Sequence, residues 1–118
     1  MQRAHADIPG AFRAAAARWP TATAIALPDA EWSFREVDRL SDRLAGALAA
    51  QGLREGDRVG LYCPNSPEFA VVYLGIVKAG ATVVPVNLLL NPKEVAFILA
   101  DAGVSALFYH AALTAQVQ

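Results

Sequence analysis

This sequence of 118 residues contains one cysteine and two histidines, and its 10 basic and 11 acidic residues nearly balance. The lone cysteine, Cys63, has no partner for an internal disulfide, which is typical of proteins in a reducing compartment, so we expect a cytoplasmic location. The formal net charge is −1, whereas nucleic-acid binders concentrate Lys and Arg, so a nucleic-acid partner is not expected. His5 and His110 stand at opposite ends of the chain, and with Cys63 they lack the close spacing of a metal site.

Long uninterrupted apolar runs are missing as well. The two longest, residues 69–77 and 79–86, are separated by Lys78, and neither approaches the roughly 20 residues of a membrane span, so no transmembrane segment is predicted. The first ten residues contain no apolar stretch of the kind found in secretory signals. Even so, 55% of the residues are hydrophobic and only 18% are charged. We interpret this apolar excess as surface that another part of a longer protein covers.

Helical periodicity, with start and stop signals, predicts four helices. The first carries Ile8, Phe12, Ala15 and Trp19 at helical spacing, an apolar stripe that we expect to be packed, and it should end before Pro20. Each of the other three begins at a residue that can cap a helix and has a glutamate three positions later, the spacing of a capping box. These pairs are Ser33 with Glu36, Asn65 with Glu68, and Asn91 with Glu94. Glycines that can stop the three helices follow at Gly52, Gly80 and Gly103.

Short runs rich in β-branched and aromatic residues alternate with the last two helices, at residues 58–62, 82–86 and 105–109. This order predicts right-handed βαβ units and an α/β fold, with part of a doubly wound parallel sheet. An earlier hairpin is predicted from Thr23–Leu27 and Glu31–Ser33, joined by a turn at residues 28–30. No linker interrupts the pattern, so residues 1–118 are expected to belong to one domain.

The turn after the strand at residues 58–62 is the natural place for a ligand, because α/β sheets bind ligands at the carboxyl ends of their strands. Residues 63–67 contain no glycine, however, and two of them are prolines, which lack the N–H groups that bind phosphate. Glu68 in the first helical turn would repel an anion. The sequence therefore favours a structural turn over a phosphate site.

The other polar and aromatic side chains are also interpreted as structural. Cys63 has no base in the nearby sequence that could make it a nucleophile, and we expect it to be a small, half-buried residue. The acidic and basic residues of the second helix are expected to form a solvated charged face, made of Asp38, Arg39, Asp42 and Arg43. Trp32 and Phe34 are predicted to be core residues. No catalytic, cofactor-binding or metal-ligating residue is predicted in this chain.

Four stretches taken in order resemble the amino-terminal segment of the adenylate-forming, or AMP-binding, enzymes. They are residues 32–37, 52–61, 64–69 and 79–87, the last continued by Asn91-Pro92 and Glu94-Val95. Each is weak alone, but their order and spacing over residues 8–109 make a specific signal. The sequence is most similar to the acyl-CoA synthetases, while luciferases and peptide-synthetase adenylation domains share the pattern. The resemblance implies the N-terminal subdomain of the adenylate-forming fold, truncated.

The resemblance further implies a longer parent enzyme that activates a carboxylic acid with ATP and Mg²⁺ and transfers the acyl group to coenzyme A. In that family the phosphate loop, the metal and adenine motif, the ribose-binding aspartate and a C-terminal lysine lie downstream, and no position of this chain matches them. We therefore expect an N-terminal fragment of an acid–thiol ligase that is inactive alone and whose partner is the remainder of the parent. The alternative is a stand-alone α/β module that binds a partner or forms a homo-oligomer through its apolar surface.

Overall fold

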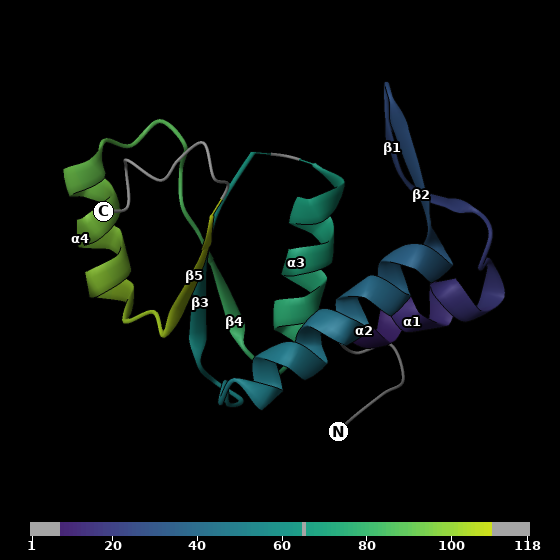
Figure 1. The fold of residues 1–118 in the computed structure, drawn as a ribbon, viewed down its shortest axis with the longest axis horizontal. Coiled ribbons are helices and arrows are strands. Elements are labelled where there is room, and N and C mark those ends of the chain that lie inside the picture. The colour runs from purple at the N-terminus through teal and green to yellow at the C-terminus, as the bar shows by residue number, and fades with distance from the viewer. Residues whose placement is uncertain (1–7, 65, 110–118) are drawn as a thin grey trace.

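Strands and helices alternate in the second half of the chain and build a three-stranded sheet (Figure 1). A computed structural model describes residues 8–64 and 66–109. In chain order the elements are α1 (Ile8–Arg18), β1 (Thr23–Leu27), β2 (Ala30–Ser33), α2 (Phe34–Ala50), β3 (Arg58–Tyr62), α3 (Pro67–Lys78), β4 (Thr82–Pro85), α4 (Pro92–Ala102) and β5 (Ala106–Tyr109).

The sheet is parallel and has the strand order β4-β3-β5. Leu61 of the central strand lies opposite Pro85 on one side and Phe108 on the other. Helices α3 and α4 lie on opposite sides of the strands (Figure 1), so the predicted doubly wound α/β arrangement is confirmed. Three strand bounds differ from the prediction by one residue, because β2 begins at Ala30, β4 ends at Pro85 and β5 begins at Ala106.

Alternate residues of β3 face opposite sides of the sheet and belong to two separate apolar clusters. The cluster on the side of α2 and α3 is formed by Leu48, Val59, Ile76 and Ala81. The cluster on the side of α4 is formed by Tyr62, Val86 and Val95. The Tyr62 hydroxyl is buried and has no hydrogen-bond partner in the part of the chain that the structure describes. Both faces of the central strand are therefore covered, as parallel sheets require.

Two of the three predicted capping boxes are confirmed. Ser33 Oγ accepts a hydrogen bond from Glu36 N at 3.1 Å, and Glu36 Oε1 accepts one from Ser33 N at 2.9 Å. These bonds hold the pKa of the Glu36 carboxyl below its usual value. Asn91 and Glu94 exchange the same two bonds at 2.9 and 3.0 Å. The starts of α2 and α4 are thus fixed by contacts between residues three positions apart.

The third predicted box, Asn65 with Glu68, is wrong. Helix α3 is capped one residue later, by Ser66, whose Oγ accepts a hydrogen bond from Phe69 N at 3.1 Å. Ser66 directly precedes Pro67, and proline is favoured at the first position of a helix. Glu68 then occupies the second helical position, where it cannot return the bond of a capping box. Asn65 itself lies outside the described residues.

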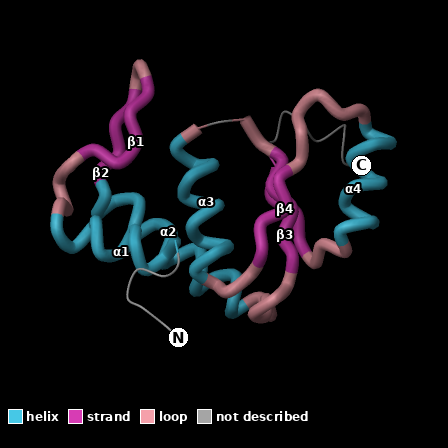
Figure 2. The backbone as a smooth tube through the Cα atoms, turned by 180° about the vertical axis from the view of Figure 1, so that it is seen from behind, coloured by secondary structure: helices cyan, strands magenta, loops and turns pink. Residues whose placement is uncertain are grey.

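Helix α1 and the β1–β2 hairpin stand beside the sheet unit (Figures 1 and 2). The predicted hairpin is confirmed as an antiparallel pair. The ring of Phe12 lies 5.4 Å from that of Phe34, centroid to centroid, and Trp32 and Phe34 are both half-buried. The predicted packing of the apolar stripe on α1 is wrong at the two ends of the stripe, because Ile8 and Trp19 are each 52% exposed. Trp19 lies beyond the last residue of the helix.

The contact between α2 and α3 contains a buried ammonium group. The Lys78 side chain is 3% exposed. Its Nζ lies 2.7 Å from Asp38 Oδ1, 3.0 Å from the Asp38 carbonyl oxygen, 2.7 Å from Ser41 Oγ and 2.9 Å from Asp42 Oδ1. Asp42 also accepts a hydrogen bond from Arg13 of α1 at 3.1 Å. One charge-assisted network therefore joins three helices.

This network corrects the prediction of a solvated charged face on α2. Arg39 and Arg43 are exposed as expected, but the Asp38 side chain is only 20% exposed because α3 lies against it. The pattern of charges within α2 could not show this, since the partner of Asp38 is 40 residues further along the chain.

Replacing the buried ammonium with an apolar group tests this network. We expect Lys78→Met to lower the free energy of unfolding by about 2–4 kcal/mol, because it leaves several oxygen acceptors without their charged donor. The matched control Lys93→Met changes an exposed lysine at the start of α4 and should stay within about 0.5 kcal/mol of the unchanged chain. Urea unfolding followed by circular dichroism measures both, and equal effects for the two variants would contradict the assignment.

Two glycines in α2 and α3 allow a second comparison. A Cβ at Gly75 would lie 2.8 to 3.0 Å from three side-chain atoms of Leu44, whereas a Cβ at Gly46 would meet nothing within 4 Å. We expect Gly75→Ala to destabilise the chain by about 1–3 kcal/mol through overpacking. Gly46→Ala should stabilise it by about 0.5–1 kcal/mol, because alanine restricts the unfolded chain and favours the helix. Thermal unfolding should move the two melting temperatures in opposite directions, and a shared direction would refute the packing argument.

Candidate functional site

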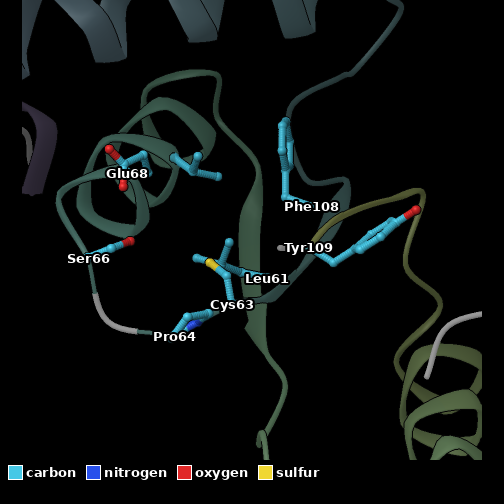
Figure 3. Close-up of a pocket in the computed structure, with 8 residues that line it drawn as sticks. Leu61, Cys63, Pro64, Ser66, Glu68, Phe108 and Tyr109 are labelled. Atoms are coloured by element: carbon cyan, nitrogen blue, oxygen red, sulfur yellow. The ribbon is translucent and has the colours of Figure 1, made fainter. Parts of the chain in front are cut away.

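A hollow of about 470 Å³ opens at the carboxyl end of the sheet, between α3 and β5 (Figure 3). Three structural units supply its lining: the end of β3 with the following turn, the start of α3, and β5. In that order the lining residues are Leu61, Cys63, Pro64, Ser66, Glu68, Val72, Phe108 and Tyr109. We refer to this site as the β5 hollow.

Apolar groups dominate the β5 hollow. Leu61 is almost fully buried at its base, and Val72 and Phe108 are half-buried. Figure 3 shows Ser66 and Glu68 on the α3 side, Phe108 and Tyr109 on the β5 side, and Leu61 and Cys63 between them. Among the described lining residues, Ser66 and Glu68 on the α3 side and Tyr109 on the β5 side have oxygen-bearing side chains. The arrangement therefore suits an apolar group and has few polar contacts with which to orient one.

The β5 hollow fits a phosphate poorly, although it lies where α/β sheets commonly bind one. Pro64 and Pro67 contribute no N–H groups, and the N–H of Phe69 is already bonded to Ser66 Oγ. The exposed Glu68 carboxylate occupies the first turn of α3, where it takes up the favourable field of the helix N-terminus. The structural interpretation of this turn agrees with these contacts.

Cys63 is half-buried in the β5 hollow, as the sequence predicts. Burial raises the pKa of its thiol above the usual value, and the nearby Glu68 carboxylate raises it further. A nucleophilic cysteine requires the opposite shift, produced by a nearby cation or base. His5 and His110 lie outside the described residues, so their surroundings are not described. The geometry around Cys63 therefore gives no support for thiolate chemistry.

The raised pKa leads to a measurable pH profile. The alkylation rate of Cys63 by iodoacetamide should rise with pH around a midpoint above that of free cysteine. Glu68→Gln should move this midpoint toward the usual value without restoring it, because burial is the larger cause. Asp101→Asn, near the end of α4, is the matched control and should leave the midpoint unchanged. A midpoint at or below that of free cysteine would show that the thiol is not desolvated.

The sequence did not predict the β5 hollow itself. A usable signal was present, since Leu61 and Phe108 sit on the same face of neighbouring strands, but the position of α3 above them is a tertiary feature. No group of three or more His, Cys, Asp or Glu side chains within residues 8–64 and 66–109 could hold a metal ion. The expectation that this chain has no catalytic, cofactor-binding or metal-ligating residue stays a prediction.

None of the helices in the described part of the chain is long and apolar enough to cross a membrane.

Comparisons with known proteins identify the family of this chain. Residues 12–118 match a family model described as AMP-binding enzyme. The sequence is 41% identical over 83 residues to the long-chain-fatty-acid–CoA ligase FadD13 of Mycobacterium tuberculosis, which covers 70% of this chain and 16% of that protein.

Two further similarities extend over more of the chain. Syringomycin synthase SyrB1 of Pseudomonas syringae pv. syringae is 37% identical over 101 residues, which covers 86% of this chain and 16% of that protein. A crystal structure of the N-terminal domain of FACL13 from Mycobacterium tuberculosis superposes with a TM-score of 0.87 at 35% identity, covering 92% of this chain and 28% of that domain structure. The chain therefore spans only a small part of the proteins that it resembles.

Proposed function

Because this chain belongs to the family of AMP-binding enzymes, we propose that it is the N-terminal part of an ATP-dependent acid–thiol ligase of the acyl-CoA synthetase type. In such an enzyme residues 1–118 supply the first layer of one AMP-binding domain. The observation that supports this most strongly is the superposition of 92% of this chain on the N-terminal domain of FACL13 from Mycobacterium tuberculosis.

The proposed role of this chain within the ligase is architectural. The ligase would convert a carboxylic acid and ATP into an acyl-adenylate and then transfer the acyl group to coenzyme A. The described residues do not fit ATP or Mg²⁺: Pro64 in the turn before α3 and Pro67 at the first helical position have no N–H groups, and Glu68 lies where an anion would bind. The chemistry is therefore assigned to the rest of the enzyme, and this chain provides a rigid sheet against which that part packs.

A second candidate is an adenylation domain that loads a carrier-protein thiol instead of coenzyme A. The similarity to syringomycin synthase SyrB1 favours it. The ligase is preferred because FadD13, a long-chain-fatty-acid–CoA ligase, has the higher sequence identity to this chain. In either case we place the enzyme in the cytoplasm, where a lone thiol such as Cys63 stays reduced.

The architectural role predicts that this chain is inactive by itself. Purified chain, mixed with ATP, Mg²⁺, coenzyme A and a long-chain fatty acid, should release no pyrophosphate above the blank. The matched control is FadD13 of Mycobacterium tuberculosis under the same conditions, tested with the same pyrophosphate assay. Pyrophosphate release that increases in proportion to the concentration of this chain would overturn the proposal.

A further inference from the structure

Helix α4 carries apolar side chains on both of its sides. On its inner side, Val95 is fully buried in the same cluster as Tyr62 of the sheet. On its outer side, Phe97 is 66% exposed beside a hollow of about 370 Å³. Figure 1 shows α4 at one end of the molecule, with the sheet on its inner side. The residues that line the hollow are Leu90, Lys93, Glu94, Phe97 and Ile98.

The loop before α4 adds a second exposed apolar side chain, Leu89, which is 92% exposed. Two hydrogen bonds hold this loop in a turn: Leu89 N donates to Asn87 Oδ1 at 2.8 Å, and Leu90 N donates to the Asn87 carbonyl oxygen at 3.2 Å. The turn therefore presents Leu89 to solvent from a fixed backbone. We refer to Leu89 and the five residues that line the hollow as the α4 face.

The middle of the α4 face contains two opposite charges. Lys93 takes part in none of the salt bridges between described residues. One carboxylate oxygen of Glu94 accepts a hydrogen bond from Asn91 N at 3.0 Å, and the other has no partner among the described residues. Consecutive residues of a helix do not face each other, so Lys93 and Glu94 are poorly placed to pair within one chain. Each can still accept an opposite charge from another molecule.

The spacing of these residues makes the α4 face complementary to itself. When two copies of a helix pack antiparallel about a twofold axis, each contact between two different positions occurs twice. An axis between positions 93 and 94 places Lys93 opposite Glu94 of the second copy, and Glu94 opposite its Lys93. Two ion pairs then form at the centre of the contact. The apolar pairs that the same axis brings together are Phe97 with Leu90, and Ile98 with Leu89.

We propose that the α4 face is a homodimer interface, in which a second copy of this chain packs its own α4 antiparallel against the first. This inference goes beyond the proposed ligase role and does not depend on it. One helix and one loop make a small interface, so we expect a weak dimer with a Kd of roughly 10–100 μM. The dilute chain of an unfolding experiment is then monomeric.

The main rival occupant of the α4 face is a lipid surface. A helix that lies on a membrane has a polar side rich in Lys and Arg, and its other side enters the lipid. The α4 face instead has one acid and one base among its apolar side chains. Contact with lipid would bury the Glu94 carboxylate without a cation, which is costly. A second copy supplies a partner for Glu94 and for Lys93, so charge complementarity favours the dimer.

Charge reversal with rescue tests the proposed register. Lys93→Glu and Glu94→Lys each place like charges opposite each other in the homodimer, so each should raise the Kd measured by sedimentation equilibrium by roughly tenfold or more. An equal mixture of the two variants should dimerise about as well as the unchanged chain, because positions 93 and 94 again meet opposite charges. Arg43→Glu, an exposed position on α2, is the matched control and should leave the Kd unchanged.

Circular dichroism checks the fold of each variant, because Glu94→Lys removes half of the capping box of α4. If Glu94→Lys does not fold, the comparison of Lys93→Glu with Arg43→Glu decides the test. A chain that stays monomeric up to roughly 1 mM, well above the Kd expected for a small interface, overturns the inference. A dimer that neither α4 variant weakens, or that the mixture of two folded variants does not restore, lies elsewhere and overturns it as well.

Two further measurements address the other occupants. Binding of the unchanged chain to phosphatidylcholine vesicles that Leu89→Ser abolishes, without any dimer in solution, would assign the α4 face to a membrane and overturn the inference. A dimer of this chain that is lost when the chain replaces the corresponding stretch of Mycobacterium tuberculosis FadD13 would show that the longer polypeptide covers the face. That result would also overturn the inference.

Discussion

The arrangement of the helices depends on the buried ammonium group of Lys78. A charge that is 3% exposed is costly to keep in a protein unless oxygen atoms surround it. Helix α2 can therefore lie on α3 only in the position that brings Asp38, Ser41 and Asp42 to that nitrogen. Gly75 permits the close approach, because any side chain there would collide with Leu44. A polar and a steric constraint together determine a contact that apolar packing alone would leave loosely defined.

The element pattern and the helix caps could be predicted from the sequence, whereas side-chain contacts between distant residues could not. The caps at Ser33 and Asn91 involve bonds across three positions, so local spacing was sufficient. Local sequence does not determine the cap of α3, because Asn65 and Ser66 are adjacent and both are good caps, and only the bond from Phe69 N to Ser66 Oγ decides between them. The pairing of Lys78 with Asp38 spans 40 positions, and no local pattern contains it.

The same contrast between local sequence signals and tertiary contacts applies to the β5 hollow. The residues that disfavour a phosphate cradle, namely the prolines and Glu68, are visible in the sequence wherever the turn lies in space. The β5 hollow itself could not be predicted, because it forms where α3 leaves Phe108 only partly covered. The family resemblance was readable in spite of this, since it rests on turn and cap residues that recur in order along the chain. The sequence therefore indicates the family of this chain more clearly than it indicates where a hollow opens on the folded surface.

The central strand of the sheet is the first of the three in the chain, which matters while the protein is being synthesised. β3 leaves the ribosome before either neighbour exists, and its backbone gains partners on one edge only when β4 follows. Its other edge is closed only when β5 pairs with it, with Leu61 opposite Phe108. Just before β5, Ser105 N donates to Arg58 O at 2.7 Å. A nascent chain that stalls before β5 therefore presents a bare strand edge to other chains, and this stretch must be completed before it is safe from aggregation.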